Sequence, residues 1–119
     1  MYREQNNLHF EVKSDIIGNG LVFLHGYSTI INVEKMGINC QIWQNVTIGK
    51  ERPGGKKPII GNNVRIFTGA VVVGDITIGD NVTIGANAVV NKSVPENCTV
   101  VGIPARIVRK NGMRISEKL

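Results

Sequence analysis

The chain has 119 residues, a formal net charge of +5 at pH 7, 14 glycines and only 5% aromatic residues. This length is typical of one domain, and the scarcity of large side chains disfavours a conventional globular core. The modest positive charge suits an anionic ligand, whereas no aromatic and basic surface pattern repeats along the chain, which argues against a nucleic-acid-binding protein. The apolar runs are too short for membrane insertion.

The N-terminal part, residues 1–15, is predicted to be an irregular lead-in to a repetitive structure. Residues 1–7 are polar, so we expect no signal peptide and a cytoplasmic protein. Apolar and polar side chains alternate over residues 8–12, as in a short extended segment. A corner is expected at residues 17–20, which read Ile-Gly-Asn-Gly.

Aliphatic residues then recur every six positions. They stand at Leu24, Ile30, Met36, Ile42, Ile48, Ile60, Ile66, Val72, Ile78, Ile84 and Val90. A period of six matches neither a helix nor a simple strand, and it is typical of a parallel β-helix in which three hexads form one triangular coil of about 18 residues. We therefore predict an all-β, single-domain chain, with coils over residues 16–104. A β-sandwich of short strands is the alternative, but its turns would be irregularly spaced.

His25 directly follows the first of these anchors and precedes a glycine. In later coils the same slot holds Trp43, Gly61 and Gly79, and we expect it on the outside of a corner or flat face. Because histidine exchanges protons near neutral pH, a histidine set among backbone and small residues can act as a general base. A surface histidine without a role is the alternative.

Two segments interrupt the hexad. Residues 50–58 (KERPGGKKP) carry four basic residues and place Gly54 at an anchor position, so we expect an extruded loop of the kind that often carries function. A solvated insertion is the alternative. Residues 105–119 are basic and are expected to form a C-terminal cap and tail. Cys40 falls in an inward slot and is expected to be a buried thiol, and the two cysteines, Cys40 and Cys98, suggest neither a disulfide framework nor a CxxC metal site.

Several motifs within this frame resemble those of the hexapeptide-repeat acetyltransferases, most closely the serine acetyltransferases and their relatives that acetylate polysaccharide sugars. The matching pieces are Ile17-Gly18-Asn19-Gly20 before Leu24-His25-Gly26, then Gln44-Asn45-Val46-Thr47-Ile48-Gly49, Lys57-Pro58-Ile59-Ile60-Gly61, and Val94-Pro95 followed by Gly102-Ile103-Pro104-Ala105-Arg106. The resemblance covers residues 16–109. It implies a left-handed parallel β-helix, a homotrimer with active sites between neighbouring coils, acetyl-CoA as acyl donor, and no metal.

The resemblance also implies roles for individual residues. His25 corresponds to the catalytic base, which takes the proton from an acceptor hydroxyl as its oxygen attacks the thioester of acetyl-CoA. Glu11, Asn45 and Lys57 are expected at the acceptor site. The pantetheine arm is expected to bond the amides of two small turns, and the CoA phosphates to meet two cations. These cofactor-binding residues are Thr68, Gly69, Ala70, Gly85, Ala86, Lys92 and Arg106.

The sequence departs from the serine acetyltransferases at three points. Only a short lead-in precedes the repeat, Phe10 stands where they have an aspartate, and Lys57 stands where their loop has a second histidine. These departures favour a sugar of polysaccharide biosynthesis as acceptor, with serine as the alternative. A zinc enzyme on this scaffold would need three histidines per site, and the chain has only His9 and His25. A non-catalytic trimeric scaffold would need neither His25 nor the phosphate-facing cations.

Overall fold

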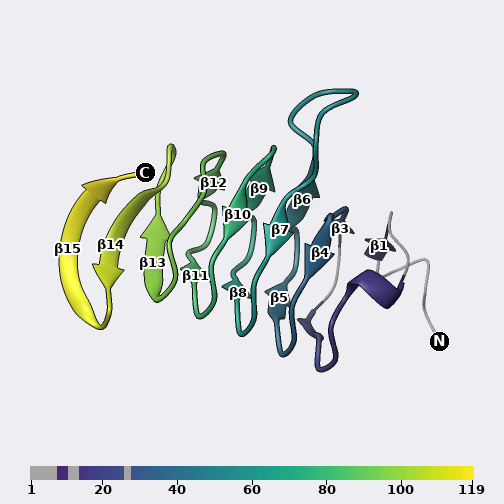
Figure 1. The fold of residues 1–119 in the computed structure, drawn as a ribbon, viewed down its shortest axis with the longest axis horizontal. Helices are drawn as coiled ribbons and strands as arrows, with labels where there is room; N and C mark the ends of the chain where they lie inside the picture. Colours follow the sequence, from purple (N-terminus) through teal and green to yellow (C-terminus); the bar gives the residue numbers. More distant parts are fainter. Residues whose placement is uncertain (1–7, 11–13, 26–27) are drawn as a thin grey trace.

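The computed structural model describes residues 8–10, 14–25 and 28–119, and it shows a stack of coils that form a three-sided prism (Figure 1). Successive coils pair through short parallel strands that make up three sheets. The predicted fold class, a left-handed parallel β-helix of hexapeptide repeats with one extruded loop, is confirmed. Within the described ranges, no helix has the length and apolar character needed to cross a membrane.

Each sheet lines one face of the prism. The first sheet contains, in order, β1 (Leu8–Phe10), β3 (Thr29–Ile31), β6 (Thr47–Gly49), β9 (Val71–Val73) and β12 (Val89–Val90). The second contains β4 (Lys35–Met36), β7 (Ile59–Ile60) and β10 (Thr77–Ile78). The third contains β2 (Val22–Leu24), β5 (Gln41–Trp43), β8 (Arg65–Ile66), β11 (Thr83–Ile84), β13 (Cys98–Val101), β14 (Arg106–Lys110) and β15 (Met113–Lys118). A short 3-10 helix, η1 (Ser14–Ile16), precedes β2.

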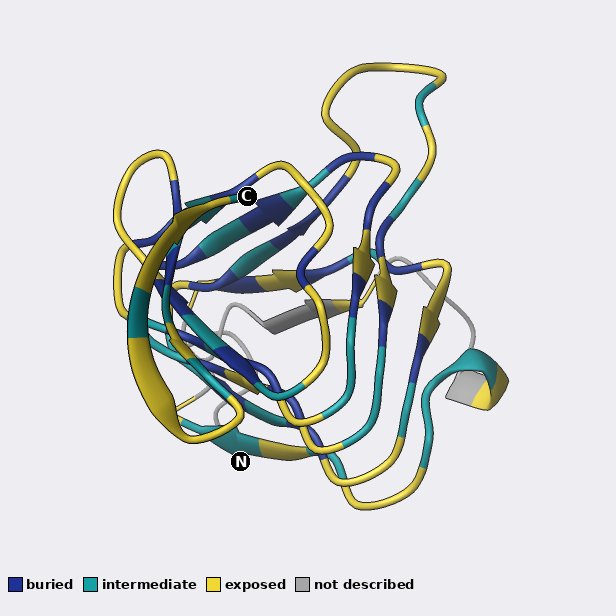
Figure 2. Ribbon diagram, turned by 60° about the vertical axis from the view of Figure 1, so that its left-hand side comes forward, coloured by how far each residue is buried: buried dark blue, intermediate teal, exposed yellow. Residues whose placement is uncertain are grey.

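Buried residues recur along the strands of the prism (Figure 2), and their inward aliphatic side chains form the core. In the third sheet Ile42 pairs with Ile66, and Ile66 pairs with Ile84, and all three side chains are fully buried. Because neighbouring strands lie about 4.8 Å apart, each anchor covers the next one directly. Burial of one such side chain contributes about 1.5–3 kcal/mol, so these columns are the main stabilising feature of the fold.

The corners between the second and third sheets bring the backbones of neighbouring coils into contact. A Cβ atom on Gly79 would lie 2.6 Å from the backbone nitrogen of Glu96, so only glycine fits there. Polar side chains also join the coils at this edge, since the amide nitrogen of Asn62 donates to Oδ1 of Asp80 at 2.8 Å and Nδ2 of Asn81 donates to Oδ1 of Asn97 at 3.0 Å. These contacts fix the spacing of successive coils.

Two of the predicted anchors are wrong. Ile31 is fully buried, whereas Ile30 is 39% exposed, and Phe23 rather than Leu24 pairs with the inward residue Ile42. The chain runs eight residues from Phe23 to Ile31, and the equivalent passage in the next coils takes six. A one-residue slip reverses which side chains face inward, so the hexad frame cannot be extended back through this enlarged corner.

The last coil continues beyond the point where the hexad pattern stops. Val94 pairs with Ile78 and Val100 pairs with Ile84, so the coil persists in a frame shifted by two residues. Residues 106–118 then form an antiparallel hairpin of β14 and β15, which extends the third sheet past β13. This hairpin covers the end of the prism (Figure 1).

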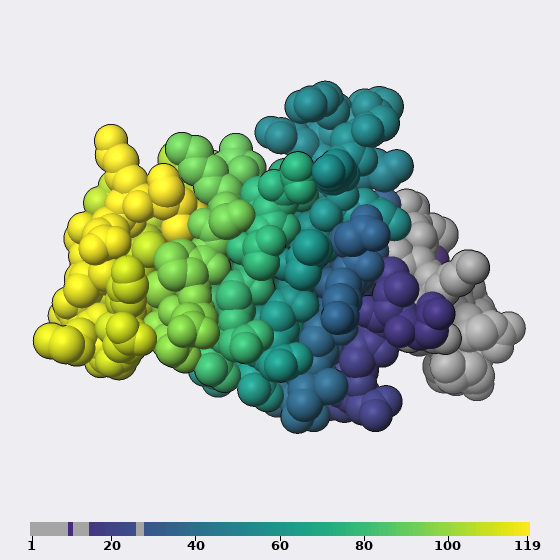
Figure 3. Space-filling view, viewed as in Figure 1, coloured from purple at the N-terminus to yellow at the C-terminus, as the bar shows by residue number. Residues whose placement is uncertain are grey.

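The segment 50–58 leaves the prism between β6 and β7 and returns to the next inward position (Figure 3). Ile48 and Ile60 are therefore consecutive anchors, and Gly54 is exposed in the loop. The other residues of the loop are mostly exposed as well. The insertion lengthens one corner without disturbing the register of the sheets on either side.

Candidate functional site

Most of the residues predicted to act in catalysis or donor binding lie along one edge of the prism, where the chain passes from the third sheet to the first. We call this edge the His25 edge, and it comprises residues 24–25, 43–46, 67–70, 85–88 and 101–105. The strand register places these segments above one another, because Leu24 pairs with Trp43 and the adjacent anchors Ile42, Ile66, Ile84 and Val100 are paired in sequence. The structure thus aligns His25, Asn45, Thr68, Gly69, Ala70, Gly85 and Ala86.

His25 occupies an unusual backbone position at this edge. It directly follows β2, its side chain is exposed, and its φ angle is 62°. A positive φ is uncommon for a residue other than glycine, and such outliers gather at functional sites. In the next coils the corresponding corners are turned by Asn45, Gly69 and Asn87, each a single residue with positive φ. The first corner is two residues longer than these, which gives His25 a position that no later coil repeats.

An aromatic pair forms a wall beside this position that the sequence reasoning missed. The rings of Trp43 and Phe67 stack with centroids 4.1 Å apart and an interplanar angle of 23°. Trp43 is paired in register with Leu24, the residue before His25. Both rings are half-buried, so they present an apolar surface at the edge. An aromatic residue directly follows each of the anchors Ile42 and Ile66, and this recurrence in the sequence could have predicted the stacked pair.

Three backbone amides of the two small turns, residues 68–70 and 85–86, already make hydrogen bonds within the chain. The amide of Gly69 donates to the carbonyl of Gln44 at 3.2 Å, and the amide of Gly85 donates to the carbonyl of Val100 at 2.9 Å. The amide of Ala70 also donates within its own turn. All three amides therefore donate to carbonyls of the chain itself in this structure, and their bonds to pantetheine carbonyls stay a prediction.

The space beside the two glycines is also filled. A Cβ on Gly69 would collide with the Asn87 side chain, and a Cβ on Gly85 would lie 2.8 Å from Cγ1 of Val101. Their lack of a side chain thus serves the approach of the next coil. A ligand on this edge would contact the outer surface of the turns, where Ala86 is exposed.

Of the residues predicted at the acceptor site, the two that the structure describes lie on different edges of the prism. Asn45 is exposed on the His25 edge. Lys57 is half-buried at the end of the loop, at the edge between the first and second sheets. Glu11 lies outside the described residues. A single copy of the chain therefore does not bring Lys57 to His25.

Lys92 and Arg106, by contrast, are brought together. Both line a hollow of about 340 Å³ at the end of the prism, which we call the basic pocket. Its lining residues are Asn91, Lys92, Ile103, Pro104, Ala105, Arg106, Lys118 and Leu119. The guanidinium of Arg106 donates from Nη2 to Oγ of Ser116 at 2.9 Å. Its lining side chains include three cations and no carboxylate, which is the electrostatic character expected of an anion site.

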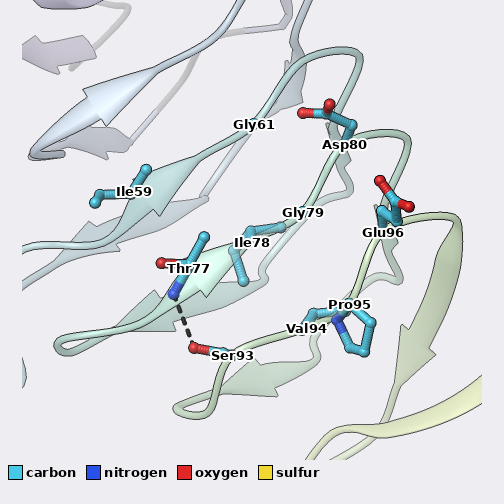
Figure 4. Close-up of a pocket in the computed structure, with 10 residues that line it drawn as sticks. All are labelled: Ile59, Gly61, Thr77, Ile78, Gly79, Asp80, Ser93, Val94, Pro95 and Glu96. Atoms are coloured by element: carbon cyan, nitrogen blue, oxygen red, sulfur yellow. Dashed lines mark hydrogen bonds between the residues drawn. The ribbon is translucent and has the colours of Figure 1, made fainter.

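A larger hollow of about 550 Å³ lies on the second face, around Ile59 and Thr77 (Figure 4). Its charged lining residues are Asp80 and Glu96, and none of the predicted catalytic, acceptor or cofactor-binding residues lines it. Carboxylates at the rim disfavour an anionic ligand such as a nucleotide. This hollow therefore does not match the predicted donor site.

The cysteines are structural rather than reactive. Both are free and buried, as predicted for Cys40, and burial raises the pKa of the Cys40 thiol. Its sulfur lies 3.3 Å from the carbonyl oxygen of Gly61, inside the coil. Burial also raises the pKa of Cys98. Among the described residues, no group of three or more His, Cys, Asp and Glu side chains is arranged to hold a metal ion.

Comparison with known proteins shows which protein family this chain resembles. Residues 57–92 match the family described as "Bacterial transferase hexapeptide (six repeats)". The resemblance to the hexapeptide-repeat acetyltransferases predicted from the sequence is confirmed.

The individual proteins that this chain resembles include several serine acetyltransferases. The chain is 50% identical over 105 residues to a serine acetyltransferase of Staphylococcus xylosus, a match that covers 85% of this chain and 48% of that protein. It is similar to the solved structure of soybean serine acetyltransferase complexed with serine, with a TM-score of 0.74, 39% identity, and coverage of 77% of this chain and 39% of the other. A serine acetyltransferase in complex with CoA gives a TM-score of 0.70 and 37% identity, and covers 77% and 38% of the two chains. The chain spans less than half the length of these relatives.

Proposed function

We propose that this chain is an acetyl-CoA-dependent O-acetyltransferase with serine as its acceptor. The observation that carries the proposal is the similarity to serine acetyltransferases over most of the chain, 85% in one relative and 77% in one solved structure. The sequence alone favoured a sugar acceptor because of the short lead-in, Phe10 and Lys57. The relatives described above are serine acetyltransferases, and this similarity supports serine as the acceptor.

In this proposal His25 is the general base. Its neutral imidazole accepts the proton of the acceptor hydroxyl as that oxygen attacks the thioester carbonyl carbon of acetyl-CoA. The carbon–sulfur bond then breaks, and the imidazolium returns the proton to the departing thiolate, so that CoA leaves as the thiol. A positioned base contributes about 10²- to 10⁴-fold to such a transfer. The exposure of His25 on the prism edge supports this role, because both substrates can reach it.

The donor is proposed to lie along the His25 edge with its phosphates at the basic pocket. Thr68, Gly69, Ala70, Gly85 and Ala86 would contact the pantetheine arm through the outer surface of their turns. Lys92 and Arg106 would bind the phosphates, which is supported by their shared position in one pocket. Holding both substrates in one place lowers the entropic part of the barrier.

The acceptor site is proposed to involve Asn45 from the His25 edge, with Glu11 and Lys57. Because Lys57 stands on a different edge of its own chain, it would reach the acceptor from a neighbouring copy. This arrangement fits the homotrimer that the resemblance implies. The predicted trimer is thus part of the same proposal, and the site is incomplete without it.

The test is a thiol-release assay with acetyl-CoA and a panel of serine, amino sugars and nucleotide-linked sugars. The variant is His25→Asn, because asparagine tolerates the left-handed backbone that His25 adopts. We expect CoA release with serine, reduced about 10²- to 10⁴-fold in the variant while its melting temperature is unchanged.

Three other results are informative. Release with a sugar but not with serine would replace the acceptor and keep the reaction. Full turnover by His25→Asn would remove His25 from the mechanism. A wild-type protein that neither binds acetyl-CoA nor releases CoA would be a scaffold rather than an enzyme.

A further inference from the structure

The C-terminal hairpin contributes directly to the basic pocket. Three separate segments form its walls: residues 91–92 at a corner, residues 103–106 at the start of β14, and residues 118–119 at the end of β15. Each segment supplies one cation, namely Lys92, Arg106 or Lys118. Lys118 lies beyond residues 16–109, where the motifs of the family resemblance are found, so no motif suggested it.

Arg106 and Lys118 face each other directly in the hairpin. They are partners in the antiparallel register of β14 and β15. Directly opposite side chains in an antiparallel pair share one face, and like charges in that position are destabilising. Within the described part of the chain, the charged side chains lining the basic pocket are all cations.

The guanidinium of Arg106 is also held in place from the hairpin. Its Nη2 donates to Oγ of Ser116 at 2.9 Å. Ser116 lies two residues before Lys118 on β15, and alternate residues of a strand point to the same side. The hydroxyl therefore fixes the guanidinium on the side of β15 that Lys118 also faces, with donors of Arg106 left for a ligand.

We propose that β15 is part of the donor-binding site: Lys118 completes a three-cation site with Lys92 and Arg106 for a phosphate group of a nucleotide, and Ser116 is the positioning residue for Arg106. This inference rests on the proposed function and extends it to residues of the hairpin. An anion shared by the three cations relieves the repulsion between Arg106 and Lys118. The volume of about 340 Å³ accommodates a phosphate with part of its nucleoside.

The hairpin offers a matched control. Arg114 also lies on β15 and directly faces another cation, Arg109, but neither lines the basic pocket. Removal of the charge of either Lys118 or Arg114 therefore relieves one like-charge pair in the same hairpin. If the basic pocket binds phosphate, removal of the charge at Lys118 alone will weaken nucleotide binding strongly.

The experiment is calorimetric titration with adenosine 3′,5′-bisphosphate, a probe that carries both phosphate positions without the pantetheine arm. We expect Lys118→Gln to raise the dissociation constant about five- to tenfold and Ser116→Ala about two- to fivefold. Lys118→Arg should bind nearly as the wild type does. Arg114→Gln should change binding less than about twofold. Without ligand, Lys118→Gln should be at least as stable as the wild type, because a like-charge pair has been removed.

Titration with CoA and with dephospho-CoA then identifies the phosphate. If Lys118→Gln abolishes the preference for CoA, the cation binds the 3′-phosphate; if both ligands weaken equally, it binds the diphosphate. Either result supports the site.

Two results would overturn the inference: no binding of the bisphosphate by the wild type, or equal weakening by Lys118→Gln and Arg114→Gln. Normal acetyl transfer together with unchanged binding in Lys118→Gln would remove the hairpin from the site and leave the proposed function intact. Bisphosphate binding that depends on Lys118, in a protein without acetyl transfer to any acceptor, would keep the site and reject the reaction.

Discussion

The middle coils and the first coil follow the same plan with different degrees of regularity. From Ile60 to Val90 each inward position follows the last by six residues, and every anchor is almost completely buried. In the first coil the passage from Phe23 to Ile31 contains two additional residues, and among its described residues His25 and Ser28 have positive φ without being glycine. The middle coils build the scaffold, and the proposed base stands where the repeat is irregular.

The difference has a physical origin. In a regular corner the chain turns in one residue with positive φ, and the turn amides bond the neighbouring coil, as Gly69 and Gly85 do. In such a corner the backbone amides already have hydrogen-bond partners, so few of them are free to bind a ligand. The lengthened first corner, the extruded loop and the shortened corner at Lys92 each interrupt this pattern. The proposed base, the loop lysine Lys57 and the phosphate-binding Lys92 stand on these interruptions, whereas the proposed pantetheine contacts lie on the outer surface of regular corners.

The largest effect is expected from a charge inside a middle coil. Ile78→Lys would place an ammonium group at a fully buried position, at a cost of several kcal/mol. We expect loss of cooperative thermal unfolding by circular dichroism. Thr77→Lys is the control, because Thr77 is exposed on the same strand. A variant with lysine at 78 that melts like the wild type would contradict the inward assignment.

The next effect tests the frame of the first coil. Ile31→Ala should cost about 2–5 kcal/mol, because Ile31 is fully buried. Ile30→Ala should cost less than about 1 kcal/mol, since that side chain is 39% exposed. Urea unfolding of both variants measures the difference. The opposite ranking would restore the uninterrupted hexad through Ile30.

The smallest effect on stability is expected in the extruded loop. Replacement of both Lys56 and Lys57 with alanine should leave the melting temperature nearly unchanged, since the loop stands outside the sheets. The Michaelis constant for one substrate should rise a few-fold, because two cations near a proposed anionic ligand are lost. Lys35→Ala, an exposed lysine on the second face, is the control and should change neither value. Identical kinetic constants in the loop variant would show that these lysines do not contribute to substrate binding.

The six-residue repeat predicted much of the fold, because the inward residue of each hexad can be identified from the spacing of aliphatic residues alone. The columns of Ile42, Ile66 and Ile84 could be read directly from the sequence, and so could the extruded loop at 50–58. Leu24 and Ile30 were misassigned because the pattern cannot show how many residues a corner contains. His25 and Arg106 were selected by their motifs, and Lys92 as a basic residue near the end of the coils, without knowledge of their neighbours.

The sequence by itself determined the repeat, the all-β class and the candidate base, since these depend on residue type and spacing along the chain. The tertiary structure alone decided which side chains meet. It placed Lys92 and Arg106 in one pocket with Lys118, separated Lys57 from His25, and committed the turn amides of Gly69 and Gly85 to the next coil. These outcomes depend on register between coils and on the fold-back of the C-terminal hairpin, which are set by contacts between residues distant in sequence.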